Sequence, residues 1–337
     1  MPSLRGWSCA ATPPPPGPAR LTQLQHYCDR EVLSGSVFVC SSASQCRASS
    51  AELPATTTFS AGQLSHVGHH YDLLAGPRRR RYPVRVVFLA METGRGHTSV
   101  TLTARRAQVL HESGDVPVAR RNPHMVGVTQ ALRTLYGLGL QDDPESEWLD
   151  LGGREPVHLF DTFALVNARL CSSTENNPKT GNPTSTSAAT DVMNGNCSRH
   201  LRATLEVLEP SLMIVQGVKV WPLLTRYGVA HPGEMLTPTL YRSTVSGRPT
   251  LVATFVHPAA RSANQNWGRL STPYLTGTVV PTLQRAAAEL SASTGRSDTA
   301  WGRRSVRVRQ SALAVADAAN ARRADIINAA RDRIRHR

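Results

Sequence analysis

Short apolar runs alternate with amphipathic segments along most of this chain. Four runs are mostly apolar, over residues 84–90, 158–166, 212–215 and 251–256. Continuous apolar runs of this length are typical of parallel strands that are covered on both faces. Helical spacing predicts helices between and after them, over residues 99–112, 128–136, 190–208, 219–227 and 279–290. Strands that alternate with helices predict an α/β fold, here a three-layer α/β/α sandwich around a central four-stranded parallel sheet.

The two ends of the chain differ in composition from this middle part. Residues 1–20 include four consecutive prolines, Pro13 to Pro16, so we expect a disordered leader there. The α/β domain is expected over residues 21–294. Residues 295–337 combine helical spacing with eleven arginines and four aspartates, which predicts a basic amphipathic helical tail. This tail packs on the domain, binds nucleic acid, or does both.

The net charge of the chain is +14, and the tail supplies half of it. A basic surface attracts polyanions and speeds their encounter with the protein, so the charge favours nucleic acid as a partner. The same excess of arginine and alanine can also come from GC-rich coding, which leaves a plain compositional explanation open.

The apolar runs of the chain are too short to cross a membrane, and this bears on the compartment of the protein. None approaches the roughly 20 residues needed to span a bilayer, and the N-terminal region lacks a signal-like apolar core. We therefore expect a cytoplasmic protein with no membrane partner, and a monomer. Its six cysteines then indicate metal binding, redox chemistry or simple burial rather than a disulfide framework.

A polar residue marks the end of each predicted strand. In chain order these residues are Glu92, Asn167, Gln216 and His257. Because the carboxyl ends of parallel strands meet at one edge of a sheet, we expect them to form one site. Gly94 and Gly96 follow the first strand, where only glycine lets the backbone come close to a ligand. The segment lacks the third glycine of a dinucleotide fingerprint and the Gly-Lys-Ser/Thr of a phosphate loop, which disfavours a nucleotide hydrolase.

Four short motifs that contain these residues follow one another along the chain. They are Asn167-Ala-Arg-Leu-Cys171, Asn196-Cys197-Ser-Arg-His200-Leu201, the segment 208–217 and His257-Pro258. The first resembles Asn-x-x-Lys-Cys and the second Cys-x-x-Tyr/His-Leu, two motifs of the uracil-DNA glycosylase superfamily in its bacterial iron-sulfur branch, family four. The third is similar to that branch's Leu-x-Pro-x-x-Ile-x-x-x-Gly, and the fourth stands in the place of its second catalytic motif. The resemblance spans residues 40–290.

The resemblance implies a four-iron, four-sulfur (4Fe-4S) cluster held by cysteine thiolates. Cys171 and Cys197 match two of its ligands, and Cys40 and Cys46 fit the N-terminal pair, although the branch spaces that pair more closely. Cys28 is a reserve candidate. A tetrathiolate site can also hold zinc, and buried cysteines without any metal remain an alternative.

The resemblance also implies the catalytic residues. Glu92 would position water or stabilise the cationic sugar, and His257 would donate a hydrogen bond to the O2 atom that gains charge as the glycosidic bond breaks. Arg261 lies where members of the superfamily have a loop that probes the duplex, so it would contact DNA.

The base itself would be flipped out of the nucleic acid and read in a pocket. Asn167 would read the pyrimidine edge with one donor and one acceptor, and Gly94 and Gly96 would give the backbone room beside the base. His124 would stack on the base in place of the usual phenylalanine, with Met125 as the next candidate.

Three departures from the superfamily bear on activity. The first motif lacks its usual proline, the stacking phenylalanine is absent, and Ala259 replaces a serine in the second catalytic motif. The leading hypothesis is a DNA glycosylase that removes uracil or a related deaminated base from DNA. The alternative is a catalytically weak iron-sulfur protein that binds damaged or single-stranded nucleic acid with the same pocket.

Overall fold

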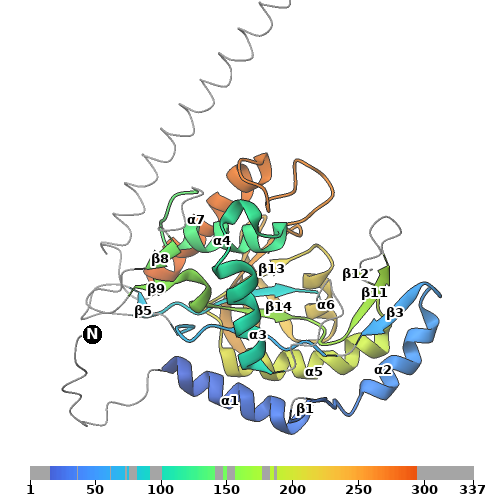
Figure 1. Ribbon diagram of the computed structural model, residues 1–337. Coiled ribbons are helices and arrows are strands. Elements are labelled where there is room, and N and C mark those ends of the chain that lie inside the picture. Colours follow the sequence, from blue (N-terminus) through green and yellow to red (C-terminus); the bar gives the residue numbers. More distant parts are fainter. Residues whose placement is uncertain are drawn as a thin grey trace, which may run out of the picture.

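The computed structural model describes residues 16–35, 37–60, 62–72, 74–75, 82–91, 101–140, 147–149, 156–176, 183–185 and 188–293. Its centre is a mixed sheet of seven strands (Figure 1). Across the sheet, the strands are β14 (Ala230–Thr237), β15 (Leu240–Val245), β16 (Arg248–Phe255), β13 (Leu212–Gln216), β7 (Val86–Ala90), β10 (Phe163–Asn167) and β4 (His66–Val67). The protein is therefore a mixed α/β protein, as the sequence predicts.

The prediction of a four-stranded parallel sheet is wrong for the sheet as a whole. The neighbours β16, β13, β7 and β10 pair in parallel, but β4, β14 and β15 extend the sheet with antiparallel pairs. β14 is largely exposed and contains Pro232, which suits an edge strand. β4 is only two residues long. These strands lack the continuous apolar run that buried parallel strands need, so the apolar pattern alone could not find them.

The core consists of two apolar layers, one on each face of the sheet. Alternate strand residues such as Phe88, Leu165 and Ile214 pack with α4 (Pro123–Leu135) and α7 (Val280–Ser293). The residues between them, such as Leu89 and Val215, pack with α1 (Pro16–Glu31), α5 (Asp191–Leu208) and α6 (Val220–Arg226). Figure 1 shows α4 and α7 on one side of the sheet and α1 and α5 on the other. Helix, sheet and helix thus form three layers.

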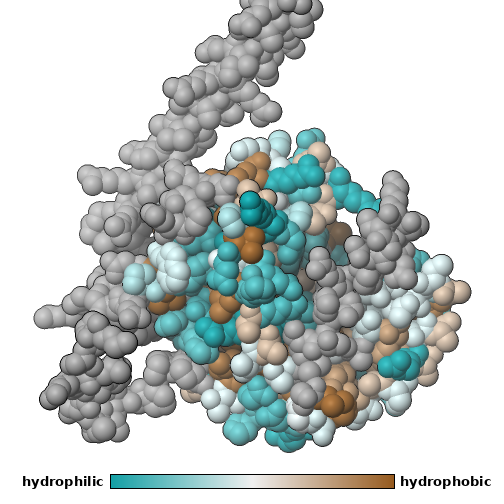
Figure 2. Space-filling view, in the orientation of Figure 1, coloured by the Kyte–Doolittle hydropathy of each residue, from teal (hydrophilic) through white to brown (hydrophobic). Residues whose placement is uncertain are grey.

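Smaller elements surround this sandwich. They are the β1–β2 pair (Leu33–Ser34, Val37–Phe38), α2 (Ala43–Ser49), the sheet of β12 (Pro183–Ser185), β11 (Ser172–Asn176) and β3 (Thr57–Ser60), the pairs β5–β6 (Leu74–Ala75, Tyr82–Pro83) and β8–β9 (Trp148–Leu149, Val157–His158), α3 (Leu102–Val109), three 3₁₀ turns (Ser50–Glu52, Val118–Arg120, Leu159–Asp161) and two π-helical turns (Leu110–Gly114, Leu275–Val279). On the face drawn in Figure 2, hydrophilic residues cover the region of α3 and hydrophobic atoms are scattered.

The predicted start of the domain at residue 21 needs correction. α1 begins at Pro16, so residues 16–20 belong to a helix and not to a disordered leader. Proline is tolerated in a first helical turn because the N–H that it lacks has no partner there anyway. Residues 1–15 and 294–337 lie outside the described residues, so the rest of the leader and the basic tail stay predictions. Within the part of the chain that is described, no helix is long and apolar enough to cross a bilayer.

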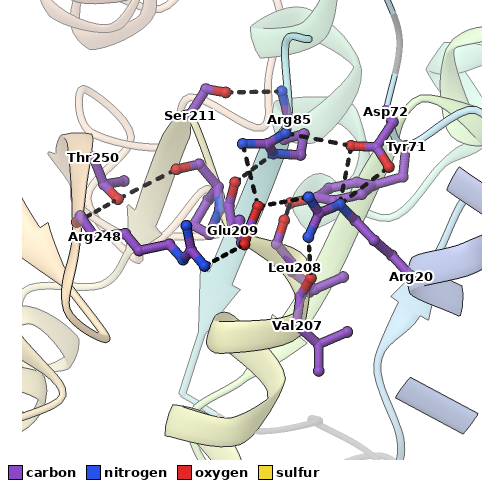
Figure 3. A network of polar contacts seen from close by, with 11 residues as sticks. Arg20, Tyr71, Asp72, Arg85, Val207, Leu208, Glu209, Ser211, Arg248 and Thr250 are labelled. Carbon is purple, nitrogen blue, oxygen red and sulfur yellow. Dashed lines mark hydrogen bonds and ion pairs between the residues drawn. The ribbon is translucent and has the colours of Figure 1, made fainter. Parts of the chain in front are cut away.

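A network of ion pairs closes the amino edge of the sheet (Figure 3). Glu209, which ends α5 in a left-handed conformation (φ 44°), pairs with Arg20, Arg85 and Arg248. Asp72 pairs with Arg20 and Arg85. The network ties the first helix to the sheet, and a cavity of about 870 Å³ lies beside it at the same edge. The ion-pair network is a stabilising feature, and it lies at the end of the strands opposite to the candidate site.

Candidate functional site

The carboxyl edge of the parallel strands brings two amide side chains to the same level. Asn167 pairs with Ala90 across β10 and β7, and Val215 pairs with Leu89 across β13 and β7. Gln216 is therefore level with Ala90 and Asn167, on the face of the sheet that packs against α4. Because β7 lies between them, the backbones of Gln216 and Asn167 are two strand spacings, or about 10 Å, apart. Both side chains are buried.

The first turn of α4 is attached to this edge through His124. The side chain of Asn122 caps the helix by accepting the N–H of Met125, at 3.0 Å. His124 Nε2 lies 2.7 Å from Gln216 Oε1, and its ring stacks on the ring of His257 with centroids 5.4 Å apart and 14° between the planes. Met125 instead packs into the apolar core. Of the two residues proposed to stack on a base, His124 is therefore the one at the edge of the sheet.

The turn after β16 is packed against α4, and this fixes His257. An added Cβ on Gly127 would lie 2.7 Å from Pro258 Cβ and 3.0 Å from Trp267 Cε3, so only glycine allows this approach. The carbonyl of Pro258 accepts the N–H of Gly268 at 2.9 Å. Trp267 is fully buried, and its indole N–H donates to the carbonyl of Val256 at 2.7 Å. The His-Pro turn thus rests on a rigid support that the sequence pattern did not reveal.

The hydrogen bonds of His257 define which of its ring nitrogens can donate. The N–H of Ala259 donates to His257 Nδ1 at 3.1 Å, so the proton of a neutral ring is on Nε2. Burial lowers the pKa of His257 below its ordinary value. Burial, with a further contribution from His257, lowers the pKa of His124 to about 4. At neutral pH the pair is therefore uncharged, and His257 can donate through Nε2 as a neutral group.

The amide of Asn167 is oriented by a second buried amide. Its Nδ2 atom donates to Gln63 Oε1 at 3.3 Å, and the backbone N–H of Gln63 donates to the carbonyl of Leu170 at 3.0 Å. One hydrogen bond therefore holds the Asn167 amide in place. A carboxamide held in this way has a second N–H to donate and a carbonyl oxygen to accept, which suits it to a polar ligand.

Gln216 joins the site without an assigned role in the sequence prediction, and the charge of Arg105 acts on the site from α3. Gln216 Nε2 is buried and has no hydrogen-bond partner in the described part of the chain. Arg105, on α3, lies close enough for its charge to lower the pKa of His124, and burial lowers its own pKa to about 10. A polar residue that ends an apolar strand marks Gln216 in the sequence, whereas nothing there distinguishes Arg105 from other helical arginines.

Four of the predicted site residues are not among the described residues that meet at this edge of the sheet. Glu92, Gly94 and Gly96 lie outside the described residues, which reach Met91 after the end of β7. The carbonyl of Met91, the last described residue after β7, accepts the N–H of Arg169 at 3.0 Å. Arg261 is exposed in the turn-rich loop between His257 and Trp267. The roles proposed for these four residues stay predictions.

The four cysteines proposed as ligands gather at one end of α5. Cys46 is on α2, which packs on α5; Cys197 is on α5; Cys171 precedes β11; and Cys40 precedes α2. Burial raises the pKa of Cys171 to about 12, with further contributions from the thiols of Cys197, Cys46 and Cys40. Burial likewise raises the pKa of Cys197 to about 11. The reserve candidate Cys28 is on α1, and its side chain belongs to the apolar layer between this helix and the sheet.

Each of the four sulfur atoms faces a nitrogen that can donate a hydrogen bond. The backbone N–H of Gly62 donates to Cys171, and those of Leu170 and Cys171 donate to Cys197. Asn196 Nδ2 lies 3.5 Å from Cys46 Sγ, and His200 Nε2 lies 3.3 Å from Cys40 Sγ. Hydrogen bonds to the ligand sulfurs are one of the factors that set the reduction potential of iron-sulfur clusters. Among the described His, Cys, Asp and Glu side chains, no three are close enough together to hold a single metal ion.

Comparisons with known proteins add a distant structural likeness. No protein family and no curated protein sequence matches the chain. The crystal structure of wild-type SMUG2 from Pedobacter heparinus is similar to it with 9% sequence identity and a TM-score of 0.36, over 82% of this chain and 98% of that chain. A likeness this distant does not decide the function, which has to be argued from the residues of the site.

Proposed function

We propose that this protein is a DNA glycosylase that hydrolyses the N-glycosidic bond of uracil or a related deaminated base in DNA. One observation carries the proposal. A fixed amide, Asn167, and a neutral histidine with its proton on Nε2, His257, stand at one edge of the sheet, in the motifs that resemble the uracil-DNA glycosylase superfamily. The amide suits recognition of the uracil edge, and the Nε2–H suits stabilisation of the uracil as it leaves.

Recognition begins with a base that has left the stack, because its glycosidic bond cannot be reached within a duplex. Asn167 would accept from the N–H of uracil and donate to the neighbouring carbonyl, a pattern that cytosine does not match. The rings of His124 and His257 are within 14° of parallel. A base that lies in the plane of His257 and accepts its hydrogen bond is therefore also parallel to His124, which can stack on it.

In the chemical step, the bond between the sugar carbon C1′ and the base nitrogen breaks, and both electrons go to the base. The charge that develops on the base oxygen O2 is stabilised by the Nε2–H of His257. Water adds to C1′ and loses a proton, with Glu92 as the group that positions water or stabilises the cationic sugar. Arg105 keeps its positive charge at neutral pH, because even its lowered pKa is about 10, and so favours an anionic leaving group.

The same proposal includes a 4Fe-4S cluster bound by Cys40, Cys46, Cys171 and Cys197. One feature of the chain supports it: a nitrogen donor faces each of the four sulfurs. The same four thiolates could hold zinc instead. When bound, the cluster would crosslink four segments of the chain and could exchange one electron.

A weakly catalytic protein that binds damaged or single-stranded nucleic acid is the second candidate. It is favoured by the contact between His124 and Gln216, since a histidine held by a hydrogen bond at 2.7 Å stands where the superfamily has a phenylalanine that stacks on the base. The missing proline before Gly94 and the presence of Ala259 point the same way.

Base release from single- and double-stranded oligonucleotides with one uracil separates the two candidates. The protein is purified without oxygen, its iron content is determined, and cleavage after alkali is measured for the parent, Glu92→Gln, His257→Ala and the exposed control His231→Ala. We expect release by the parent and the control, and loss in both site variants with DNA binding retained. No release by iron-replete parent that still binds DNA would establish the binding protein instead.

A further inference from the structure

Three residues of one motif on α5 face the four cysteines that are proposed as ligands. Asn196, Cys197 and His200 lie within four positions of one another on this helix, which places the first and last one turn apart on the same side. Cys197 is a proposed ligand, and the two other side chains contact the two thiols that come from the N-terminal part of the chain. The helix therefore reaches three of the four sulfurs.

His200 is the more buried of the two donors, with 2% of its surface exposed. Its Nε2 atom lies 3.3 Å from Cys40 Sγ, and its Nδ1 atom lies 2.8 Å from the hydroxyl of Tyr27 on α1. Both ring nitrogens are therefore engaged, and the ring is fixed between a side chain of the first helix and a proposed ligand.

The direction of these two hydrogen bonds depends on the state of Cys40. A neutral imidazole carries one proton, so one nitrogen donates and the other accepts. A thiolate can only accept, which requires Nε2–H to donate to Cys40 and the hydroxyl of Tyr27 to donate to Nδ1. A cysteine that binds metal is a thiolate, so metal binding selects this arrangement.

Asn196 makes the corresponding contact with the second N-terminal thiol. Its Nδ2 atom lies 3.5 Å from Cys46 Sγ and 3.4 Å from Gln45 Oε1. Since an amide nitrogen only donates, Asn196 is the donor in this contact and the sulfur of Cys46 is the acceptor.

We propose that His200, oriented by Tyr27, and Asn196 are positioning residues for the cluster, which donate hydrogen bonds to Cys40 and Cys46 so that α5 holds the cluster by one ligand and two donors. The inference rests on the cofactor part of the proposed function. An N–H···S bond draws negative charge from the thiolate, which favours the reduced cluster and raises its reduction potential. It also holds the ligand in place, and loss of such partners typically weakens metal retention by about 10- to 100-fold.

The test compares the reduction potential of the reconstituted cluster and the rate of iron loss to a chelator in four full-length variants. His200→Phe removes the donor, His200→Gln retains one, Tyr27→Phe removes the group that orients the ring, and the exposed His231→Phe is the matched control. We expect a more negative potential and about 10-fold faster iron loss in His200→Phe. Tyr27→Phe should shift both in the same direction by less, and His200→Gln and the control should stay near the parent.

Parental potential and iron retention in His200→Phe would overturn the inference. If that variant fails to fold, Tyr27→Phe decides, because it leaves the imidazole in place: unchanged values there would refute the hydrogen-bond chain. A parent that takes up no iron and sulfide would refute both the cluster and its positioning residues. Uracil release by the same preparation would still test the glycosylase separately, so failure of one proposal is distinguishable from failure of the other.

Discussion

Replacing Gly127 with alanine tests whether α4 supports the His-Pro turn as closely as the structure describes. The new Cβ would lie 2.7 Å from Pro258 Cβ, closer than Cβ atoms come to other atoms in folded proteins, and a tight 3.0 Å from Pro258 Cγ. Pro258 is buried and its carbonyl accepts a hydrogen bond from Gly268, so it cannot simply move aside. Overpacking of this kind costs about 1–3 kcal/mol, and the tight contact favours the upper half. Alanine in a helix offsets about 1 kcal/mol, so we expect a net loss of about 1–2 kcal/mol.

Urea unfolding measures this loss, and the matched control is Gly195→Ala in the interior of α5. An added Cβ on Gly195 would meet only Tyr227 Cε1, at an ordinary 3.6 Å, so this variant should gain about 1 kcal/mol. We also expect slower base release by Gly127→Ala, since a displacement of about 1 Å at a reacting group can cost about 100-fold in rate. A Gly127→Ala protein as stable as Gly195→Ala, with the parental rate, would refute the close packing of α4 on the His257 turn.

Three further predictions follow from the buried charges, the histidines and the tail. The folded-state pKa of His124, about 4, is below that of an unfolded histidine, so the unfolded chain binds more protons between pH 6.5 and 4. The free energy of unfolding should therefore fall as pH decreases through this window, by at most about 1.4 kcal/mol per pH unit for this residue, and His124→Phe should reduce the slope in urea titrations at several pH values. Glu147→Ala leaves the buried Arg121 without its bidentate partner, at 2.7 and 2.8 Å, and should cost about 3–5 kcal/mol in the same assay. Asp191→Ala, which breaks an exposed pair, should cost about 0–1 kcal/mol. Deletion of residues 305–337 should weaken DNA binding and flatten its dependence on salt if the tail contacts phosphates, and an unchanged slope would assign the tail to packing.

The sequence locates the middle of the sheet better than its borders. The strands β7, β10 and β13 are fully buried, and full burial is what a continuous apolar run reports. β14 is mostly exposed and β15 alternates only in part, so their pairing depends on the neighbouring strand rather than on their own composition. Edge strands carry little of the pattern that identifies a strand from one sequence.

The candidate site divides in the same way between local and tertiary information. Asn167 and His257 are recognisable because a polar residue at the end of an apolar strand is a local signal. The contacts of His124 with Gln216 and His257 join residues about 90 and 130 positions apart, and no local pattern records them. The same holds for Trp267, whose support of the His257 turn depends on packing against Gly127.

The thiol of Cys171 and the amide of Asn167 are held by two adjacent residues, Gly62 and Gln63, which gives the short spacing between Asn167 and Cys171 a physical meaning. The side chain of Gln63 accepts from Asn167, while the backbone N–H of the preceding Gly62 donates to the sulfur of Cys171. Gly62 has a φ of +76°, and an added Cβ would lie within 2.6 Å of the Phe38 ring, so this donor is available only because the position is glycine. The backbone N–H of Gln63 also donates to the carbonyl of Leu170, so the chain between Asn167 and Cys171 is bound to the same segment. If the proposed cluster binds, it would therefore stiffen the segment that holds Asn167, and through that segment it would act on the proposed recognition of the base without touching the base.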